Sequence, residues 1–441
     1  MKPRNLLIAA ALLAALSGVV WWAKRHPQSS ASTSTTPPSP KLADIPEANV
    51  KEIQIQKKDG PAVTLDRQNG KWVISAPQPL PADQDAATTV ASSLSPLTAD
   101  SVVEDKPANL NQYGLNGPSL TVTVKEKAGK TDQVVFGDDV PAGSLVYARF
   151  NSSPKVYTVS SSVKSSFDKG LNDLRDKRLL TFDTNQVTRV DIASPKADIE
   201  FGKNNQNDWQ ILKPKPYRAD GFQVEELLRK LSDAKMDLSS SSEDTKKAAA
   251  SFASGKAVGA AKVSDAAGTQ TLEVHANKDD YYAKSSVVDG IYKISSDLGK
   301  EMEKPLDDFR NKKIFDFGFS DPTKIEVQRG DSAKTYTKAG QDWKLDASVM
   351  NPGAVQTFID KLRDLSSTKF LDSGFTTPVA TITVTSNSGK RIEKVEFAKN
   401  ADGYIAHRVN EPALYQLDAK SVNDMLEASN SIKPAAPASK K

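Results

Sequence analysis

Histidine is the residue of this sequence best suited to bind a metal, and His275 has the most promising neighbours. Asn277, Asp279 and Asp280 follow it closely and offer oxygen donors. A zinc site needs several ligands at fitting intervals, however, and no second histidine is nearby. We therefore expect His275 to lie at a solvated strand end, and we expect neither a metal nor a cofactor.

Paired carboxylates are the second candidates for chemistry. They occur at Asp138-Asp139, Asp279-Asp280 and Asp307-Asp308. Glycoside hydrolysis needs two carboxylates that face each other across a cleft, whereas adjacent residues of a strand point to opposite faces. No glycine-rich phosphate loop, nucleophile elbow or zinc-helix motif accompanies the pairs. The sequence therefore favours a non-enzymatic protein.

Two clusters of basic residues recur at equivalent places and form the candidate interaction site. They consist of Arg175, Lys177 and Arg178 and of Arg310, Lys312 and Lys313. Clustered cations bind lipid headgroups or an acidic partner. The alternative is that each cluster ends a helix, where positive charge is favourable to the helix dipole.

The elements that position these residues form a repeat, which is marked by three tryptophans. Trp72, Trp209 and Trp343 recur at nearly equal intervals. Each follows an alternating strand and lies on the second arm of a predicted hairpin. A fixed period indicates tandem modules. We expect the three indoles to lie in module cores; the alternative is an exposed row that stacks on sugars.

Each repeat continues with a helix, a middle strand, two short strands and a second helix. In the second repeat Asp220 is a suitable N-cap, and an apolar stripe follows it at Val224, Leu227, Leu228 and Leu231. One repeat thus has the order β-β-α-β-β-β-α. The predicted fold class is α+β, with three tandem modules and mainly antiparallel sheets. Docked neighbours are expected, with independent modules as the alternative.

A glycine–proline motif precedes the middle strand in two of the repeats. It reads Tyr113-Gly114-Leu115-Asn116-Gly117-Pro118 in the first and Ser373-Gly374-Phe375-Thr376-Thr377-Pro378 in the third. The first glycine of each motif predicts a positive φ. The second repeat lacks the motif, and its Ser- and Ala-rich residues 239–262 predict a mobile loop.

Residues 5–23 are an uninterrupted apolar stretch. At about 1.5 Å per residue a helix of this length spans roughly 28 Å, close to the thickness of a hydrocarbon core. Trp21 and Trp22 lie at its far edge, as an interface belt does. We expect a single-pass signal anchor in a bacterial cytoplasmic membrane, with the bulk of the chain outside the cytoplasm. A signal peptide cleaved near Ser17 is the alternative.

Composition limits the compartment and the partners. The chain has no cysteine, which excludes disulfides and suits a bacterial envelope. Its 59 basic and 55 acidic residues are interspersed, so a nucleic-acid partner is not expected. The predicted segments are a transmembrane helix at 1–26, a Ser/Thr/Pro-rich spacer at 27–43, modules at 44–183, 184–317 and 318–432, and a disordered tail at 433–441.

Several motifs follow the N-terminal segment in a fixed order. They are Lys71-Trp72-Val73-Ile74, Pro81-Ala82-Asp83, the Tyr113-Gly114-Leu115 motif, Val156-Tyr157 and Arg175-Asp176-Lys177. In this order the chain resembles the bacterial domain-of-unknown-function 4340 family, best over the first two modules. The resemblance implies an envelope protein, in some members an accessory component beside gliding-motility-type ABC transport systems. It supplies no catalytic residues.

We therefore expect a non-enzymatic, membrane-anchored envelope protein that acts as a scaffold or accessory module for a protein partner, without a small-molecule substrate. The alternative is a binder of cell-wall or other glycans, through exposed tyrosines or the basic clusters. An enzyme of unknown class is the third hypothesis.

Overall fold

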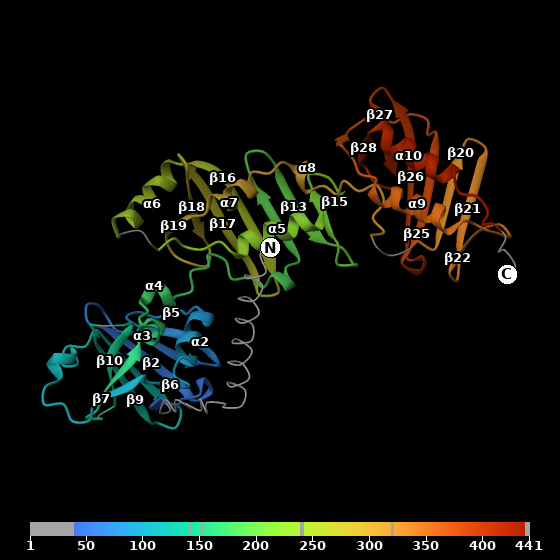
Figure 1. Cartoon of the computed structure of the whole chain (residues 1–441). Helices are drawn as coiled ribbons and strands as arrows, with labels where there is room; N and C mark the ends of the chain where they lie inside the picture. Colours follow the sequence, from blue (N-terminus) through green and yellow to red (C-terminus); the bar gives the residue numbers. More distant parts are fainter. Residues whose placement is uncertain (1–38, 142, 152, 239–241, 319–321, 437–441) are drawn as a thin grey trace, which may run out of the picture. The chain divides into compact units, whose positions relative to one another are not determined.

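The computed structural model describes residues 39–141, 143–151, 153–238, 242–318 and 322–436. None of the helices in these ranges has the length and apolar character needed to span a membrane. The predicted anchor at residues 5–23 lies outside the described residues. The chain forms two compact units, Met1–Asp176 and Lys177–Lys441, which are coloured blue to green and green to red in Figure 1.

The first unit contains module 1, a nine-stranded antiparallel sheet in the order β5-β4-β3-β2-β8-β9-β10-β11-β7. Its strands are β2 (Val50–Lys57), β3 (Val63–Gln68), β4 (Lys71–Ala76), β5 (Leu80–Pro81), β7 (Ser101–Glu104), β8 (Leu120–Glu126), β9 (Thr131–Asp139), β10 (Leu145–Phe150) and β11 (Val156–Ser160). A separate pair is formed by β1 (Lys41–Ala43) and β6 (Leu97–Thr98). Its helices are α2 (Gln84–Ser92), α3 (Ser161–Phe167) and α4 (Leu171–Leu174).

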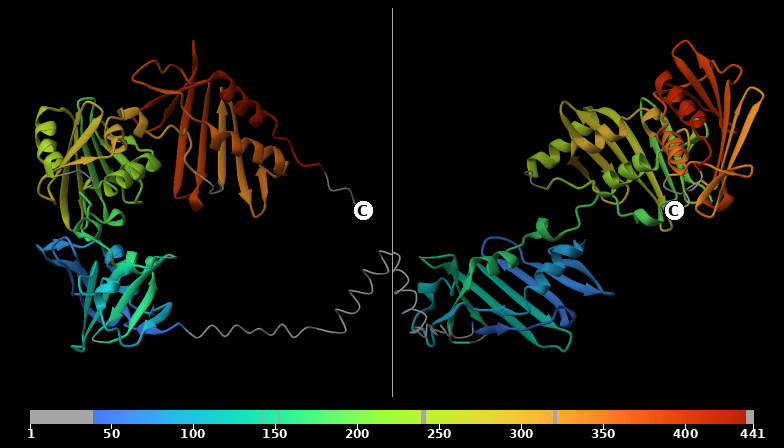
Figure 2. Two further views of the ribbon diagram at one scale, coloured as in Figure 1. Left: turned by 60° about the vertical axis from the view of Figure 1, so that its left-hand side comes forward. Right: turned by 45° about the vertical axis from the view of Figure 1, so that its right-hand side comes forward.

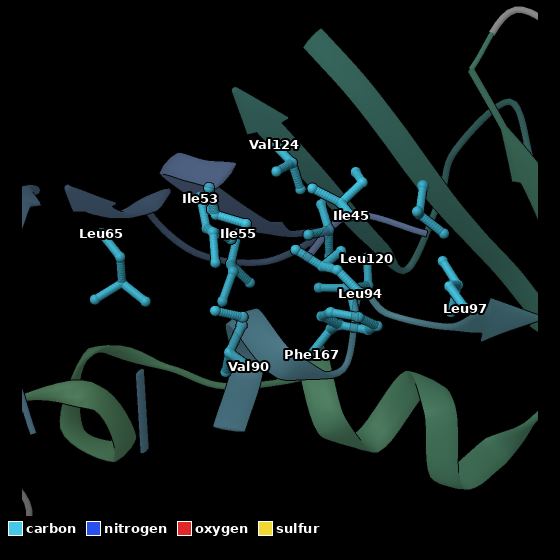
Figure 3. Packing of buried hydrophobic residues seen from close by; sticks show 14 of the residues in the cluster. Ile45, Ile53, Ile55, Leu65, Val90, Leu94, Leu97, Leu120, Val124 and Phe167 are labelled. Atoms are coloured by element: carbon cyan, nitrogen blue, oxygen red, sulfur yellow. The ribbon is translucent and has the colours of Figure 1, made fainter. Parts of the chain in front are cut away.

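The core of module 1 lies between the sheet and the helices that cover one of its faces. Figure 3 shows Ile53 and Ile55 of β2 pointing toward Val90 of α2, with Phe167 of α3 beside them, and all four side chains are buried. Trp72 belongs to the same cluster and is 2% exposed. The predicted place of this indole in the core is confirmed.

The second unit contains modules 2 and 3. In module 2 the sheet has the order β15-β14-β13-β12-β16-β17-β18-β19. Its elements are β12 (Arg189–Ala193), β13 (Asp198–Lys203), β14 (Trp209–Lys213), β15 (Tyr217–Arg218), α5 (Gly221–Ser232), α6 (Ser242–Ser254), β16 (Lys256–Asp265), β17 (Gly268–Asn277), β18 (Asp280–Ser285), β19 (Ile291–Ile294), α7 (Ser296–Met302) and α8 (Leu306–Phe309).

Module 3 repeats this arrangement in the order β23-β22-β21-β20-β25-β26-β27-β28-β24. Its elements are β20 (Lys324–Arg329), β21 (Ser332–Ala339), β22 (Asp342–Leu345), β23 (Ser348–Val349), α9 (Pro352–Asp364), β24 (Lys369–Leu371), β25 (Ala380–Ser386), β26 (Arg391–Asn400), β27 (Gly403–Arg408), β28 (Leu414–Leu417) and α10 (Ala419–Asn430). Figure 2 shows the orange and red helices α9 and α10 together on one face of this sheet. Trp209 and Trp343 are each 6% exposed, so these two indoles are also in cores, as predicted.

The α+β class and the antiparallel sheets are confirmed, but the predicted order β-β-α-β-β-β-α is wrong. Each module has three main strands before the first helix and four after it. The missed strands include β3 and β9. In β9 the consecutive residues Val134, Val135 and Phe136 are all buried, because Val135 packs into a second cluster on the other face of the sheet. A strand covered on both faces lacks the alternation by which strands are recognised.

The segment before the middle strand packs on the face of the sheet opposite the main core. In module 1, Tyr113 lies edge-on to Tyr147 of β10, with 4.9 Å between ring centroids. In module 2, Phe252 of α6 stacks on His275 of β17 at 3.9 Å. The predicted mobile loop at 239–262 is therefore wrong over its described part, which contains α6 and most of β16. Its alanines, which favour helix, explain α6.

The predicted spacer at 27–43 is wrong at its end, because β1 belongs to module 1. The N–H of Ala99 donates to the carbonyl of Pro40 at 2.7 Å. The equivalent bonds of modules 2 and 3 run from Met236 to Lys177 at 2.8 Å and from Ser367 to Lys312 at 2.7 Å. Each module thus begins with a short segment that pairs with the residues after its first helix, as strand β1 in module 1 and through an isolated β-bridge in modules 2 and 3.

Modules 2 and 3 also extend beyond their predicted limits. Leu179, Leu180 and Phe182 pack in the core of module 2, before its predicted start at residue 184. At the C-terminus the N–H of Ala435 donates to the carbonyl of Val349 at 2.8 Å. The predicted disordered tail at 433–441 therefore includes residues that pair with the sheet of module 3.

Candidate functional site

The basic cluster Arg310, Lys312 and Lys313 lies where modules 2 and 3 meet, but its members have different environments. Arg310 is 8% exposed. Its guanidinium carbon lies 4.0 Å from the ring centroid of Tyr217 in module 2 and 3.6 Å from that of Phe370 in module 3. A cation between two rings is stabilised by both. Arg310 thus joins the modules and is not exposed for a lipid or a partner.

Lys312 and Lys313 are exposed, and both line a cleft of about 900 Å³ between modules 2 and 3. We call it the intermodule cleft. Its walls come from the β13–β14 turn and the start of α5 in module 2, and from the start of β26 in module 3. Of the six basic residues predicted as a contact site, these two are the ones that the structure brings to this cleft.

In the cluster Arg175, Lys177 and Arg178 the two arginines form isolated β-bridges, and the other cluster forms the corresponding bridges. Arg175 pairs with Ala82 through an isolated β-bridge, and Arg178 pairs in the same way with Lys235. Arg310 and Lys313 form the corresponding bridges with Ala219 and Ser366. Arg175 and Arg310 also follow the last residues of α4 and α8. The bridges at the junctions are therefore what the two clusters share; no basic residue lies in the last turn of α4 or α8, and a helix-end position applies to Arg175 and Arg310 alone.

A network of ion pairs forms the floor of the intermodule cleft. Arg218 of module 2 donates from Nε to Glu411 of module 3 at 3.2 Å. Arg408 donates from Nε to the same carboxylate at 2.7 Å, and from both terminal nitrogens to Oε1 of Glu393 at 3.1 Å. The backbone N–H of Asp316 also donates to Oε1 of Glu393, at 2.8 Å. Of these bonds, the one between Arg218 and Glu411 joins the two modules, and the others fix Glu411 and Glu393 within module 3.

Burial and charge act in opposite directions on the ionisable groups of this network. Burial favours the neutral form of Glu411, but Arg218 and Arg408 outweigh it, so the pKa of Glu411 is lowered. Burial also opposes the charge of Arg218, yet Tyr415, Glu411 and Asp316 outweigh it and raise its pKa. Burial raises the pKa of the Tyr415 hydroxyl. Glu411 and Arg218 are therefore charged at neutral pH.

Two exposed apolar side chains line the same cleft, one from each module. Phe222 at the start of α5 is 72% exposed, and Ile392 of β26 is 67% exposed. Among the large apolar side chains exposed in the described ranges, these two have the highest exposed fractions. The residues that line the cleft around them are mostly polar or charged.

Arg391 connects the two walls of the cleft. It donates to the carbonyl of Asp316 at 2.6 Å, and its other terminal nitrogen lies 3.7 Å from a carboxylate oxygen of Asp208 in module 2. Beside Arg391, Glu393 faces the core of module 3 and its side chain is 3% exposed. Oε2 of this carboxylate has no hydrogen-bond partner among the described residues.

The residues first considered for chemistry are not brought together. The prediction that His275 lies at a solvated strand end is wrong. Its ring stacks on Phe252, and its Nδ1 lies 2.7 Å from the carbonyl oxygen of that residue. In the described ranges no three His, Asp or Glu side chains are grouped as metal ligands would be. Asp280 pairs with Lys293 at 2.8 Å and Asp307 with Arg310 at 3.0 Å, so these carboxylates serve local ion pairs.

Comparison with known proteins gives a family and no characterised relative. No curated protein and no solved structure matches the sequence. One family pattern matches twice, over residues 72–208 and 209–403, and both matches begin at a tryptophan of the repeat. Together they cover most of the chain and contain every residue of the cleft discussed above except Arg408 and Glu411. The chain belongs to the family described as Domain of unknown function (DUF4340).

Proposed function

We propose that this chain is a non-enzymatic protein of the bacterial envelope that binds a protein partner in the intermodule cleft. The observation that carries the proposal is the position of Phe222 and Ile392, the two most exposed large apolar side chains of the described residues, in one cleft. Protein interfaces concentrate their binding energy in a few such anchors, often aromatic, inside a polar rim. The arginines of the floor support a stable geometry for this surface.

The remaining parts of the proposal rest on the sequence and the family resemblance. The apolar residues 5–23 support a membrane anchor with the modules outside the cytoplasm. By analogy with similar family members, the partner is a component of an ABC-type transport or gliding-motility-type complex. A non-enzymatic role is supported by the ion pairs of the cleft, where Glu411 and Glu393 are both bound to Arg408.

Crosslinking in native membranes tests the proposal. A photoreactive phenylalanine analogue placed at Phe222, or at Ile392, is expected to form an adduct with one envelope protein. The same analogue at Val287, which is also exposed but does not line the cleft, is the matched control. Adduct formation at Phe222 should be lost when Ile392 is changed to Asp. Equal labelling from Val287, or no adduct from either cleft position, would contradict the proposal.

Glycan binding is the alternative function, and the same variants separate it from the first. The three tryptophans of the repeat are buried, so they offer no stacking surface for a sugar. Retention of the full chain on wall polysaccharide, lost in Phe222→Asp and kept in Val287→Asp, with no protein adduct, would favour the glycan function.

A further inference from the structure

The side chains of the intermodule cleft indicate what kind of segment it receives. Three amide side chains from the β13–β14 hairpin line it: Asn204, Asn207 and Gln210. Asn204 uses its side-chain oxygen within the turn, where it accepts from the N–H groups of Gln206 and Asp208. Asn207 and Gln210 each carry a donor and an acceptor, which is the same pair of groups that a peptide main chain offers. This wall is therefore suited to hydrogen bonding with main-chain amides, independently of sequence.

The charges of the cleft are nearly balanced. Five basic and six acidic residues line it. Its three arginines are paired: Arg218 with Glu411, Arg391 with Asp208 and Arg408 with Glu393. A strongly acidic or strongly basic segment therefore gains little from this surface, since like charges would oppose it as much as unlike charges attract it.

A buried acceptor at the floor requires a donor. Oε2 of Glu393 lacks a hydrogen-bond partner among the described residues, while Oε1 accepts from Arg408 and from the N–H of Asp316. A buried polar oxygen without a donor is unfavourable. The oxygen is closed to the cleft in this arrangement, so the hydrogen bonds of the occupant are made with the amides of the hairpin.

We propose that the cleft binds an extended, weakly charged polypeptide segment of the partner. One apolar side chain of the segment packs between Phe222 and Ile392, and its main chain bonds to Asn207 and Gln210. A sugar fits less well, because the apolar contacts come from two separate side chains, one of them aliphatic, and the neighbouring Trp209 is buried. This inference rests on the proposed function, because it names the part of the partner that enters the cleft.

A random peptide library displayed on phage and selected against the detergent-solubilised full chain tests the inference. The recovered peptides should share an apolar residue and carry few charges. The double variant Asn207→Gly and Gln210→Ala should bind a recovered peptide about tenfold or more weakly, since each lost hydrogen bond is worth about 1 kcal/mol. Glycine is chosen because Asn207 has a positive φ of 66°. Val287→Asp is the control that should bind normally.

Some results would overturn the inference without touching the proposed function. Peptides rich in one sign of charge, or affinity unchanged in the amide variant, would contradict an extended neutral segment. If no peptide binds but crosslinking at Phe222 still captures one envelope protein, the partner uses a folded surface. If crosslinking fails as well, the proposed function itself is wrong. Unchanged thermal unfolding of each variant shows that lost binding does not come from misfolding.

Discussion

The guanidinium of Arg218 in module 2 lies 3.2 Å from the carboxylate of Glu411 in module 3. Glu411 also accepts from Arg408 at 2.7 Å and from the Tyr415 hydroxyl at 3.0 Å. Side-chain exposure is 13% for Arg218 and 22% for Glu411. A charge pair with so little exposure stabilises one arrangement of its neighbours more strongly than a surface pair does. The contact is one of several that join modules 2 and 3, together with Arg310 between Tyr217 and Phe370.

The lowered pKa of Glu411 predicts an acid-sensitive contact between modules. The folded pKa lies below the ordinary value of 4.5, so the carboxylate contributes stability that is present above 4.5 and is lost as the pH falls through the folded value. Glu411→Gln should lower the free energy of unfolding by about 2 kcal/mol at neutral pH. Urea unfolding at several pH values should show the two proteins converging below pH 4.5. A difference that stays constant into acid would contradict this account.

Arg310→Ala should destabilise the second unit through the loss of two ring contacts. A desolvated cation–π contact is worth about 2 kcal/mol, so a loss of that size or somewhat more is expected in chemical denaturation. The neighbouring Lys312→Ala is the matched control, because an exposed side chain usually changes stability by less than about 0.5 kcal/mol. Equal effects of the two substitutions would show that the stacking of Arg310 on Tyr217 and Phe370 is unimportant.

The elements of each module were more predictable than the cleft. The first helices are read directly from periodicity and caps; Asp220 accepts from the N–H groups of Phe222 and Gln223, as its N-cap role predicted. The exposure of Phe222 also has a sequence signal, because this residue lies outside the apolar stripe that begins at Val224 and faces the core. Glu393 was missed in the sequence, and the structure places it in line with the buried residues Val395 and Phe397 of β26.

The pairing across modules had no such signal. Arg218 and Glu411 lie far apart in the sequence, and neither is part of a local motif. Their contact depends on how one module docks on the next, which periodicity within a module does not encode. For the same reason the sequence did not distinguish Arg310 from its basic neighbour Lys312, although Arg310 is buried and Lys312 is exposed.

Trp209→Ala should cost roughly 3–5 kcal/mol, the usual loss for a large aromatic side chain removed from a core. The side chain is 6% exposed and belongs to the main cluster of module 2. Thermal or urea unfolding measures the change. A loss well below about 1 kcal/mol would mean that the indole is exposed in solution and would strengthen the glycan alternative.

Gly137→Ala should displace the Tyr113 segment from the sheet of module 1. A Cβ at this position would overlap the carbonyl oxygen of Tyr113. Forced overpacking of this kind costs about 1–3 kcal/mol. Gly117→Ala is the control, since no atom lies within 4 Å of its Cβ position. Hydrogen exchange should become faster at Leu110–Tyr113 in the first variant and stay unchanged in the second; unchanged exchange in both would contradict the close approach.

A distance measurement across the cleft tests most directly whether modules 2 and 3 hold a fixed binding surface. The chain has no cysteine, so Phe222→Cys and Ile392→Cys provide the two spin-label sites without background. Double electron–electron resonance on the full chain should give one narrow distance distribution, which broadens when Glu411→Gln is added. A broad distribution in the protein with Glu411 intact would contradict the fixed cleft.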